Sequence, residues 1–502
     1  MKKKRKKSGR RFLRSRWHVI LAILLEVFFL AYILISGSRI SQAFLYLLMG
    51  VSTLSSLVIL SGKGENAYKL AWIFWILTFS VFGGFFYILL QSQWSKKSFA
   101  RRAREAEERV KAHLPATNEP PPHPAMRYLR NSVGYPTTTA HTCTYFASGE
   151  EMHKALLSAL SSAKRYIFLE FFIIEEGKMW SSLLDILKRK AAEGVKVRVL
   201  YDDVGCFTHL PRRYFKKLRD YGIEAAAFHP FVSLFSIEQN NRDHRKIAVI
   251  DGEVAFTGGV NIADEYINEI EKFGHWKDAA ALVKGSAALS FALMFLQMWE
   301  LSEKKKEDIS AFLPESEERE EPLLVAPYAD SPMDDESVSE NVYLSLIHNA
   351  RNYIYITTPY LIISDTMQNA LTLAAKSGVD VRVITPKKWD KRIVHTVTRS
   401  YYGELLKAGV KVYEYTPGFI HAKTVVSDDA IASVGTANFD YRSLYLHFEC
   451  GALFVDEGTV LHVKNDFLET LEKSEPIAPE NKKENIFIRV KDAILRLLAP
   501  LL

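Results

Sequence analysis

The chain has 502 residues, which is too long for a single hydrophobic core and predicts two or three domains. Its net charge is +7, but residues 1–16 alone hold ten Lys and Arg and no acid, so subtracting ten leaves −3 for the rest. This distribution excludes a generally basic nucleic-acid-binding surface and indicates a contact made by the N-terminus. The three scattered cysteines form neither a disulfide framework nor a CxxC metal pair; they are Cys143, Cys206 and Cys450.

Three apolar runs follow the basic arm of residues 1–16, at about 17–35, 43–60 and 70–90. The first is interrupted by Glu26, whereas the third is long, free of charge and rich in aromatic residues, so it is the strongest candidate for a membrane span. We expect residues 17–92 to anchor the chain in a membrane through two or three helices. The first run lacks the small-residue cleavage site of a secretory signal peptide.

Basic residues also follow the runs, at positions 96–104. Positive charge on both sides of a membrane region predicts an even number of crossings. We therefore expect two crossings, with the first run lying in the interface or against its neighbour, and the rest of the chain in the cytoplasm.

Residues 93–135 are charged and then rich in proline, which predicts a short helix and a linker. The following sequence repeats itself in two halves, 136–325 and 326–502. Segments of the first half resemble segments of the second: Ala163–Glu170 and Ala350–Thr357, Ala191–Leu200 and Ala374–Ile384, Leu218–Ile223 and Leu405–Val410. Each unit has a strand, an amphipathic helix, a glycine and a β-branched strand, which predicts an α/β fold with helices covering a sheet.

Two smaller segments complete this pattern. The charge-rich stretch 302–322 between the halves predicts a solvated loop. The chain ends in an amphipathic helix at Ile486–Leu498, which fits docking on the core or contact with a bilayer.

The halves share one polar motif. In the first it contains His244, Lys246 and Asp251; in the second, His421, Lys423 and Asp428. In both copies Lys lies two residues after His and Asp lies seven after it. A Gly lies fourteen residues after each His, and an Asn lies seventeen after it, at Asn261 and Asn438. Chance does not produce two copies with these shared offsets inside a wider repeat, so we expect them to meet in one active site.

Residue types at these spacings indicate phosphodiester chemistry. His and Lys two apart on a strand share a face, whereas Asp251 and Asp428 lie beyond the strand's end and are expected to order a turn. Of two imidazoles, one can attack phosphorus while the other, protonated, donates to the leaving oxygen. The lysines and amides offer donors to the phosphate oxygens. His-x-Lys is a poor metal-binding pattern, so no metal or other cofactor is expected.

The motifs resemble the HKD motifs of the phospholipase D superfamily, and the whole chain resembles the bacterial cardiolipin synthases. Further matching stretches are Glu170–Ile174, Gly258–Tyr266, Trp276–Asp278 and Thr358–Tyr360. The resemblance implies two pseudo-symmetric phospholipase D-like domains, each a mixed sheet flanked by helices, behind N-terminal transmembrane helices. It implies that His244 forms a phosphatidyl-histidine from one phosphatidylglycerol while His421 protonates the departing glycerol. His421 would then deprotonate the terminal hydroxyl of a second phosphatidylglycerol. It also implies an acid behind each histidine, for which Asp278 and Glu449 are the candidates.

The same motif residues serve other enzymes of this superfamily. A lipid hydrolase would use water as acceptor, and another phosphatidyltransferase a different alcohol. An HKD nuclease is disfavoured by the apolar runs and by the charge of the catalytic region. The expected partners are phosphatidylglycerol and anionic bilayer lipids rather than nucleic acid, and an oligomer is compatible with the sequence.

Overall fold

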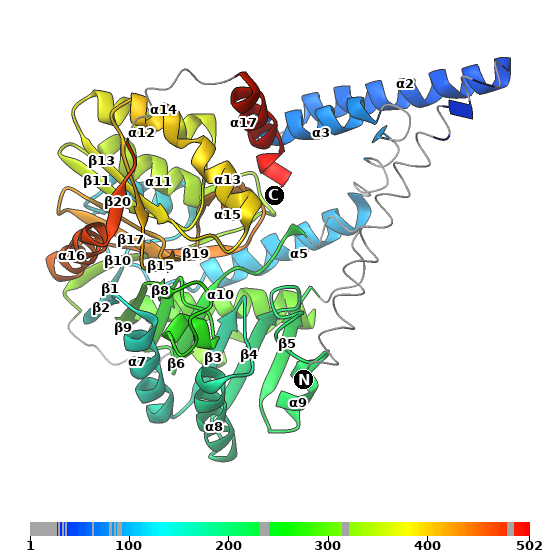
Figure 1. The fold of residues 1–502 in the computed structure, drawn as a ribbon. Helices are drawn as coiled ribbons and strands as arrows, with labels where there is room; N and C mark the ends of the chain where they lie inside the picture. The colour runs from blue at the N-terminus through cyan, green and yellow to red at the C-terminus, as the bar shows by residue number, and fades with distance from the viewer. Residues whose placement is uncertain are drawn as a thin grey trace. The chain divides into compact units, whose positions relative to one another are not determined.

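The computed structural model describes residues 38–62, 65–79, 93–229, 240–313, 321–478 and 486–501, with single positions between 28 and 87. Two compact units are present. One contains Ala100–Pro230 and Asn241–Asp492, and the other contains Met1–Phe99, Phe231–Asn240 and Ala493–Leu502. Figure 1 shows the described elements with their labels. We call the first the catalytic unit and the second the N-terminal unit.

The N-terminal unit contains helices α2 (Arg39–Ser61) and α3 (Asn66–Thr78). Among the described residues one helix, Gln42–Ser61, is long and apolar enough to cross a membrane, with a mean hydropathy of 2.1 over 20 residues. It lies in the second apolar run. The third run, which we expect to be the strongest candidate, is described only in part, as the 13-residue helix α3 and a few further positions, so that expectation stays a prediction. Much of that run, the first run with Glu26, and the basic arm lie outside the described residues.

In the catalytic unit, the first half forms a seven-stranded mixed sheet in the order β2-β9-β7-β6-β3-β4-β5. Strands β3, β4 and β5 are parallel, and the other neighbours are antiparallel. The strand bounds are Thr142–Phe146 (β2), Ala280–Lys284 (β9), Val254–Gly258 (β7), Lys246–Ile250 (β6), Tyr166–Phe171 (β3), Lys196–Asp202 (β4) and Glu224–Phe228 (β5). The helices are α7 (Gly149–Ser162), α8 (Lys178–Ala192), α9 (Tyr214–Arg219) and α10 (Ser286–Glu303).

The second half forms a nine-stranded sheet whose seven central strands repeat that order: β10-β19-β17-β16-β11-β13-β14. Their bounds are Leu323–Asp330 (β10), Glu449–Phe454 (β19), Ile431–Gly435 (β17), Thr424–Ser427 (β16), Tyr353–Thr357 (β11), Asp380–Pro386 (β13) and Lys411–Tyr415 (β14). The edges are β1 (Thr138–Ala140) and β20 (Ser474–Pro476). The helices are α11 (Val338–Asn349), α12 (Asp365–Lys376), α13 (Arg392–Ser400), α14 (Tyr402–Lys407), α15 (Tyr441–Tyr445) and α16 (Glu457–Glu472). Helix α17 (Ile486–Leu498) crosses the boundary between the units, which falls after Asp492. The predicted internal repeat and α/β fold are therefore confirmed.

Local sequence explains the repeated helix ends. Ser148 and Ser364 cap α7 and α12 by accepting hydrogen bonds from backbone amides three residues on. Helices α8 and α12 are followed by Gly194 and Gly378, whose φ values of 89° and 96° favour glycine, as the sequence predicts.

The two halves share structural parts. Helix α10 is buried along almost its whole length and contacts β3, β5, β6, β7 and β9 of the first sheet and β1 and β10 of the second. Strand β1, from the first half of the sequence, pairs with β10 of the second sheet. Strands β8 (His275–Lys277) and β15 (Gly418–Ile420) join the halves as a parallel pair.

Residues 93–135 are more folded than the sequence suggests. They contain α5 (Gln93–Lys111), α6 (Pro124–Tyr128) and a π-helix at Leu129–Val133. Ala103, Val110, Met126 and Leu129 are buried, and these residues belong to the catalytic unit. The expected linker is therefore wrong from Ala100 onward, because its apolar side chains pack into the core.

The charged stretch 302–322 is also partly folded. It contains a 3-10 turn at Ile309–Phe312, with both of these residues buried. Residues 314–320 lie outside the described chain. The C-terminal helix is present as α17, and Ile486, Val490 and Ile494 are exposed along it.

Candidate active site

The two motif histidines occupy equivalent positions in the two sheets. His244 precedes β6 and His421 precedes β16, the strands next to β3 and β11. Both side chains are buried, with 7% of the residue surface exposed. Lys423 lies close enough to lower the pKa of His244, so the two copies meet in one site, as the sequence predicts.

Each histidine is paired with an acid from the opposite half. His244 Nδ1 lies 2.8 Å from Glu449 Oε1, and His421 Nδ1 lies 2.7 Å from Asp278 Oδ2. Both acids are fully buried. Since a carboxylate accepts a hydrogen bond, each neutral imidazole carries its proton on Nδ1 and presents a free Nε2.

Backbone hydrogen bonds fix this crossed arrangement. The amide of His244 donates to the carbonyl of Phe448 (3.0 Å), next to Glu449. The amide of His421 donates to the carbonyl of Lys277 (2.7 Å), next to Asp278. Each His segment therefore lies along the acid segment of the other half, and neither half contains a complete histidine–acid pair.

The two lysines are held beside the histidines. Lys246 Nζ donates to the carbonyl of His244, and Lys423 Nζ donates to that of His421. Each residue is 2% exposed. Burial lowers the pKa of Lys246 to about 8 and that of Lys423 to about 7. An ammonium group that is costly to bury gains most from an anionic ligand, so these lysines suit phosphate oxygens.

Burial and the neighbouring lysines favour the neutral form of both motif histidines. Burial, and then Lys423, lower the pKa of His421 to about 4 although Asp278 opposes the shift. Burial, and then Lys246 and Lys423, lower the pKa of His244 well below its usual range. A bound phosphodiester anion would offset the lysine charges and raise both values.

The two acids differ in their own proton affinity. Burial would raise the pKa of Asp278, but His421 and Lys423 outweigh it and hold the value below normal. Burial raises the pKa of Glu449 to about 7, with Lys246 and the side-chain hydrogen bond from Thr436 opposing it. Glu449 is therefore the acid whose ionisation depends on its neighbours.

The two motif asparagines are buried and have hydrogen-bond partners of their own. Asn261 accepts from the Ile173 amide (3.0 Å) and donates to the Tyr266 hydroxyl (2.8 Å). Asn438 donates to Asp440 (3.1 Å). Each side-chain amide has a second N–H, so a phosphate contact remains a prediction.

The motif aspartates lie at the opposite end of the motif strand. Asp251 accepts from the backbone amides of Lys164, Arg165 and Tyr166 at 2.7–2.8 Å. Asp428 accepts from the amides of the equivalent segment 351–353, also at 2.7–2.8 Å. Seven residues of nearly extended chain span about 20 Å, so these carboxylates act on the turn, as expected, and not on the imidazoles.

Several charged residues around His244 were not singled out from the sequence. Arg242 forms a bidentate, buried ion pair with Asp202. Arg245 is fully buried and donates to the Glu449 carbonyl and to Gln297. Burial raises the pKa of Asp243 to about 7. The charged run Arg242–Arg245 directly precedes the predicted buried motif strand. Charged residues in such a place require partners, so this run was the sequence signal that could have identified them.

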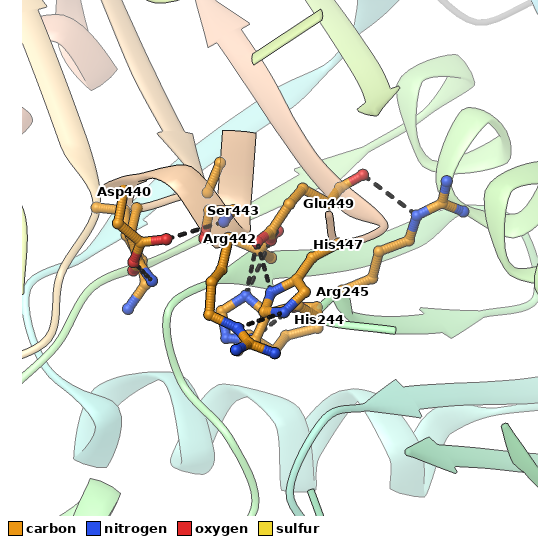
Figure 2. A network of polar contacts seen from close by, with 12 residues as sticks. His244, Arg245, Asp440, Arg442, Ser443, His447 and Glu449 are labelled. Atoms are coloured by element: carbon orange, nitrogen blue, oxygen red, sulfur yellow. Dashed lines mark hydrogen bonds and ion pairs between the residues drawn. The ribbon is translucent and has the colours of Figure 1, made fainter. Parts of the chain in front are cut away.

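His447 was missed as well. It lies two residues before Glu449, is 9% exposed, and its ring centroid is 5.4 Å from that of His244 (Figure 2). His244, His447 and Glu449 place potential metal-ligand atoms within 4.8 Å of one another. Lys246 and the Arg442 guanidinium, which is 3.4 Å from His447, add positive charge that opposes cation binding.

Two like-ordered sheets, each with a buried His–Lys motif at an equivalent strand, define a phospholipase D-like fold. A solved phosphatidylserine synthase of Haemophilus influenzae shares this fold, with a TM-score of 0.56, 16% identity, and coverage of 75% of this chain and 96% of that one. The family model "Cardiolipin synthase, PLD-like domain" matches residues 156–284 and 343–471, more than half of the chain.

Similar full-length proteins agree with that match. An uncharacterised protein of Streptococcus mutans is 40% identical, over 89% of this chain and 99% of its own length. The cardiolipin synthase of Geobacillus thermodenitrificans is 36% identical, over 87% of this chain and 89% of its own length. Cardiolipin synthase 2 of Bacillus cereus is 36% identical over 86% of each chain. The chain belongs to the cardiolipin synthase family of phospholipase D-like proteins.

Proposed function

We propose that this protein is a cardiolipin synthase that transfers a phosphatidyl group from one phosphatidylglycerol to another, releasing glycerol. The observation that carries the proposal is the single site built from both motifs, in which each histidine is held by an acid of the other half. Membership of the family supports the choice of substrate.

The first step uses His244 as nucleophile. Its Nε2 forms a bond to phosphorus while the bond from phosphorus to the glycerol oxygen breaks. His421, protonated once the anionic lipid has entered, gives its proton to that oxygen. Glu449 balances the positive charge that develops on the His244 ring.

The second step reverses the proton transfer. Neutral His421 takes the proton of the terminal hydroxyl of a second phosphatidylglycerol. That oxygen bonds to phosphorus, the bond from His244 to phosphorus breaks, and cardiolipin leaves with His244 restored. Lys246, Lys423, Asn261 and Asn438 hold the phosphate oxygens in both steps. No cofactor takes part, because fixed protein charges supply the electrostatic stabilisation.

Exposed side chains near the site fit a bilayer. Lys391 is close enough to act on the charge of His244. Its neighbours Trp389 and Ile393 are 49% and 59% exposed, and Lys387 and Lys388 are exposed beside them. An exposed aromatic residue among lysines is suited to the surface of an anionic membrane.

The N-terminal unit would keep the enzyme at its substrate. Helix α2 contains one apolar span, and we propose two crossings within residues 17–92, with residues 1–16 and the catalytic unit in the cytoplasm. A tag fused after Leu502 should be protected from an impermeant reagent in intact cells. Labelling of that tag from outside would contradict this topology.

The product decides between synthase and hydrolase. Purified full-length protein is incubated in vesicles with labelled phosphatidylglycerol, and the lipids are separated. We expect cardiolipin and glycerol in equal amounts. Phosphatidic acid as the sole lipid product would overturn the synthase proposal in favour of a hydrolase.

A further inference from the structure

His447 occupies the position in the second half that Trp276 occupies in the first. Each lies two residues before the acid of its half and one residue before a backbone carbonyl bonded to a motif histidine. The ring centroids are 5.4 Å apart for His447 and His244, and 5.3 Å for Trp276 and His421. The pseudo-symmetry therefore gives each catalytic pair an additional nitrogen-bearing ring.

In the first half, that ring donates to the acid. Trp276 Nε1 can only donate, and it lies 3.4 Å from Asp278 Oδ2, the oxygen that also contacts His421. The indole therefore stabilises the ionised form of Asp278 and fixes the carboxylate against His421.

In the second half, Arg442 determines which nitrogen of His447 carries the proton. Arg442 Nε lies 3.4 Å from His447 Nε2 (Figure 2). A guanidinium group only donates, so Nε2 accepts and a neutral His447 carries its proton on Nδ1. His447 Nδ1 is 3.8 Å from Glu449 Oε1 and has no hydrogen-bond partner among the described residues.

The surrounding charges keep His447 neutral. Burial, and then Arg442, His244, Lys246 and Arg242, lower its pKa well below the ordinary range. Glu449 is the acid that faces it. An imidazole that stays neutral does not shuttle protons, but it has one N–H to donate, and that N–H is directed towards Glu449.

We propose that His447 is a positioning residue that donates its Nδ1–H to Glu449 and keeps this carboxylate ionised while His244 carries the phosphatidyl group. For this bond to form, the distance from His447 Nδ1 to Glu449 Oε1 shortens from 3.8 Å to about 3 Å. Glu449 then accepts from His244, Thr436 and His447. This inference uses the proposed role of His244, but not the identity of the acceptor.

The test compares two substitutions in the full-length protein. His447→Leu removes the N–H, whereas His447→Asn keeps a side-chain N–H donor. The assay is cleavage of a soluble phosphodiester, bis(p-nitrophenyl) phosphate, across pH, so its result does not depend on whether phosphatidylglycerol or water is the natural acceptor.

For His447→Leu we expect kcat to fall about tenfold, roughly the value of one hydrogen bond to a charged group, with little change in KM. The acidic limb of the kcat profile should move to higher pH, because Glu449 is then protonated more easily. His447→Asn should restore most of kcat and return the limb towards its original position.

Two results would overturn the proposal: a His447→Leu enzyme with unchanged kcat and pH profile, or equal losses in both variants without a shift of the limb. If His447→Leu does not fold, Arg442→Met provides the same test, since it frees His447 to move its proton to Nε2. The acidic limb should shift upward in that variant too, and an unshifted limb would contradict the proposal.

Discussion

The two halves of the catalytic unit use one motif in different surroundings. Around His421 the motif neighbours are Phe419, Ile420 and Ala422, whereas around His244 they are Arg242, Asp243 and Arg245. The acid partners differ in the same way: Asp278 has a lowered pKa, and that of Glu449 is raised to about 7. Two copies of one motif can thus supply two distinct chemical roles, because the neighbouring residues give each imidazole a different electrostatic environment.

Substitutions of Glu449 and Asp278, the acids that each pair with the histidine of the other half, should separate the roles of the two histidines most clearly. Glu449→Gln should impair His244 and slow formation of the covalent intermediate. Asp278→Asn should impair His421 and slow the steps that need an acid or a base. By analogy with acids that orient catalytic histidines, each loss should be about 10²- to 10⁴-fold in kcat. Rapid-quench measurements with labelled phosphatidylglycerol distinguish the two steps.

A result that ties each acid to the histidine of its own half would contradict the crossed pairing. In that case Asp278→Asn would mainly block intermediate formation. Glu449→Asp and Asp278→Glu serve as controls, because they retain the charge while changing its reach.

Substitution of a motif lysine tests whether the residues that bind phosphate destabilise the folded protein. Lys423→Met should lower kcat/KM by about 10²-fold or more, yet raise the thermal unfolding midpoint. Its pKa is about 7 in the folded protein and ordinarily 10.5. Protonated Lys423 therefore lowers the free energy of unfolding. This destabilisation is complete below pH 7 and decreases as the pH rises to 10.5.

The gain in unfolding midpoint from Lys423→Met should accordingly be largest near pH 6 and disappear above about pH 10. Calorimetry of the ligand-free protein at several pH values measures it. Lys190→Met is a suitable control, because Lys190 lies on α8, outside both motifs, and is paired with Glu193. A Lys423→Met protein less stable than the parent at pH 6 would contradict the account.

The motif aspartates should affect folding and not chemistry. Asp251→Ala leaves three amides without their acceptor, and we expect a loss of about 2–4 kcal/mol in the free energy of unfolding. Asp251→Asn keeps one oxygen and tolerates the φ of 57°, so its loss should be about half. Denaturant unfolding measures both.

Activity per folded molecule should stay within a few-fold in these variants, and Asp428→Ala should behave like Asp251→Ala. If folded Asp251→Ala protein lost activity as severely as a motif-histidine variant, the assignment of this residue to the turn would be wrong.

The smallest expected effect concerns the exposed loop near the site. Trp389→Ser should lower kcat/KM for phosphatidylglycerol in anionic vesicles by a few-fold, about 1 kcal/mol of lost interfacial burial. Cleavage of a soluble phosphodiester should not change. Leu373→Ser is a matched control, since Leu373 is 62% exposed on α12. Equal effects of both substitutions would argue against a specific membrane contact.

The sequence predicted the fold and the motif residues because both depend on local patterns. Matching segments revealed the repeat, strand and helix periods indicated the α/β fold, and equal offsets from His to Asn identified the two motif copies. The turn role of Asp251 and Asp428 followed from their distance along a strand.

The crossed pairing could not be predicted, because Glu449 and Asp278 reach their histidines through contacts between halves. His447 was hidden for the same reason: its neighbour His244 is about 200 residues away in sequence. The folding of residues 100–135 was missed because Ala103 and Val110 lie among charged residues, and their burial depends on tertiary contacts.

The most direct measurement locates the covalent intermediate. His421→Ala protein is mixed with labelled phosphatidylglycerol, quenched, digested and analysed by mass spectrometry under conditions that preserve phosphohistidine. We predict a phosphatidyl adduct on the peptide that contains His244, slow to form and slow to turn over. His244→Ala protein should form no adduct and lose at least about 10⁴-fold in kcat. An adduct on His421 in the unsubstituted enzyme, or turnover by His244→Ala protein at a comparable rate, would contradict the account.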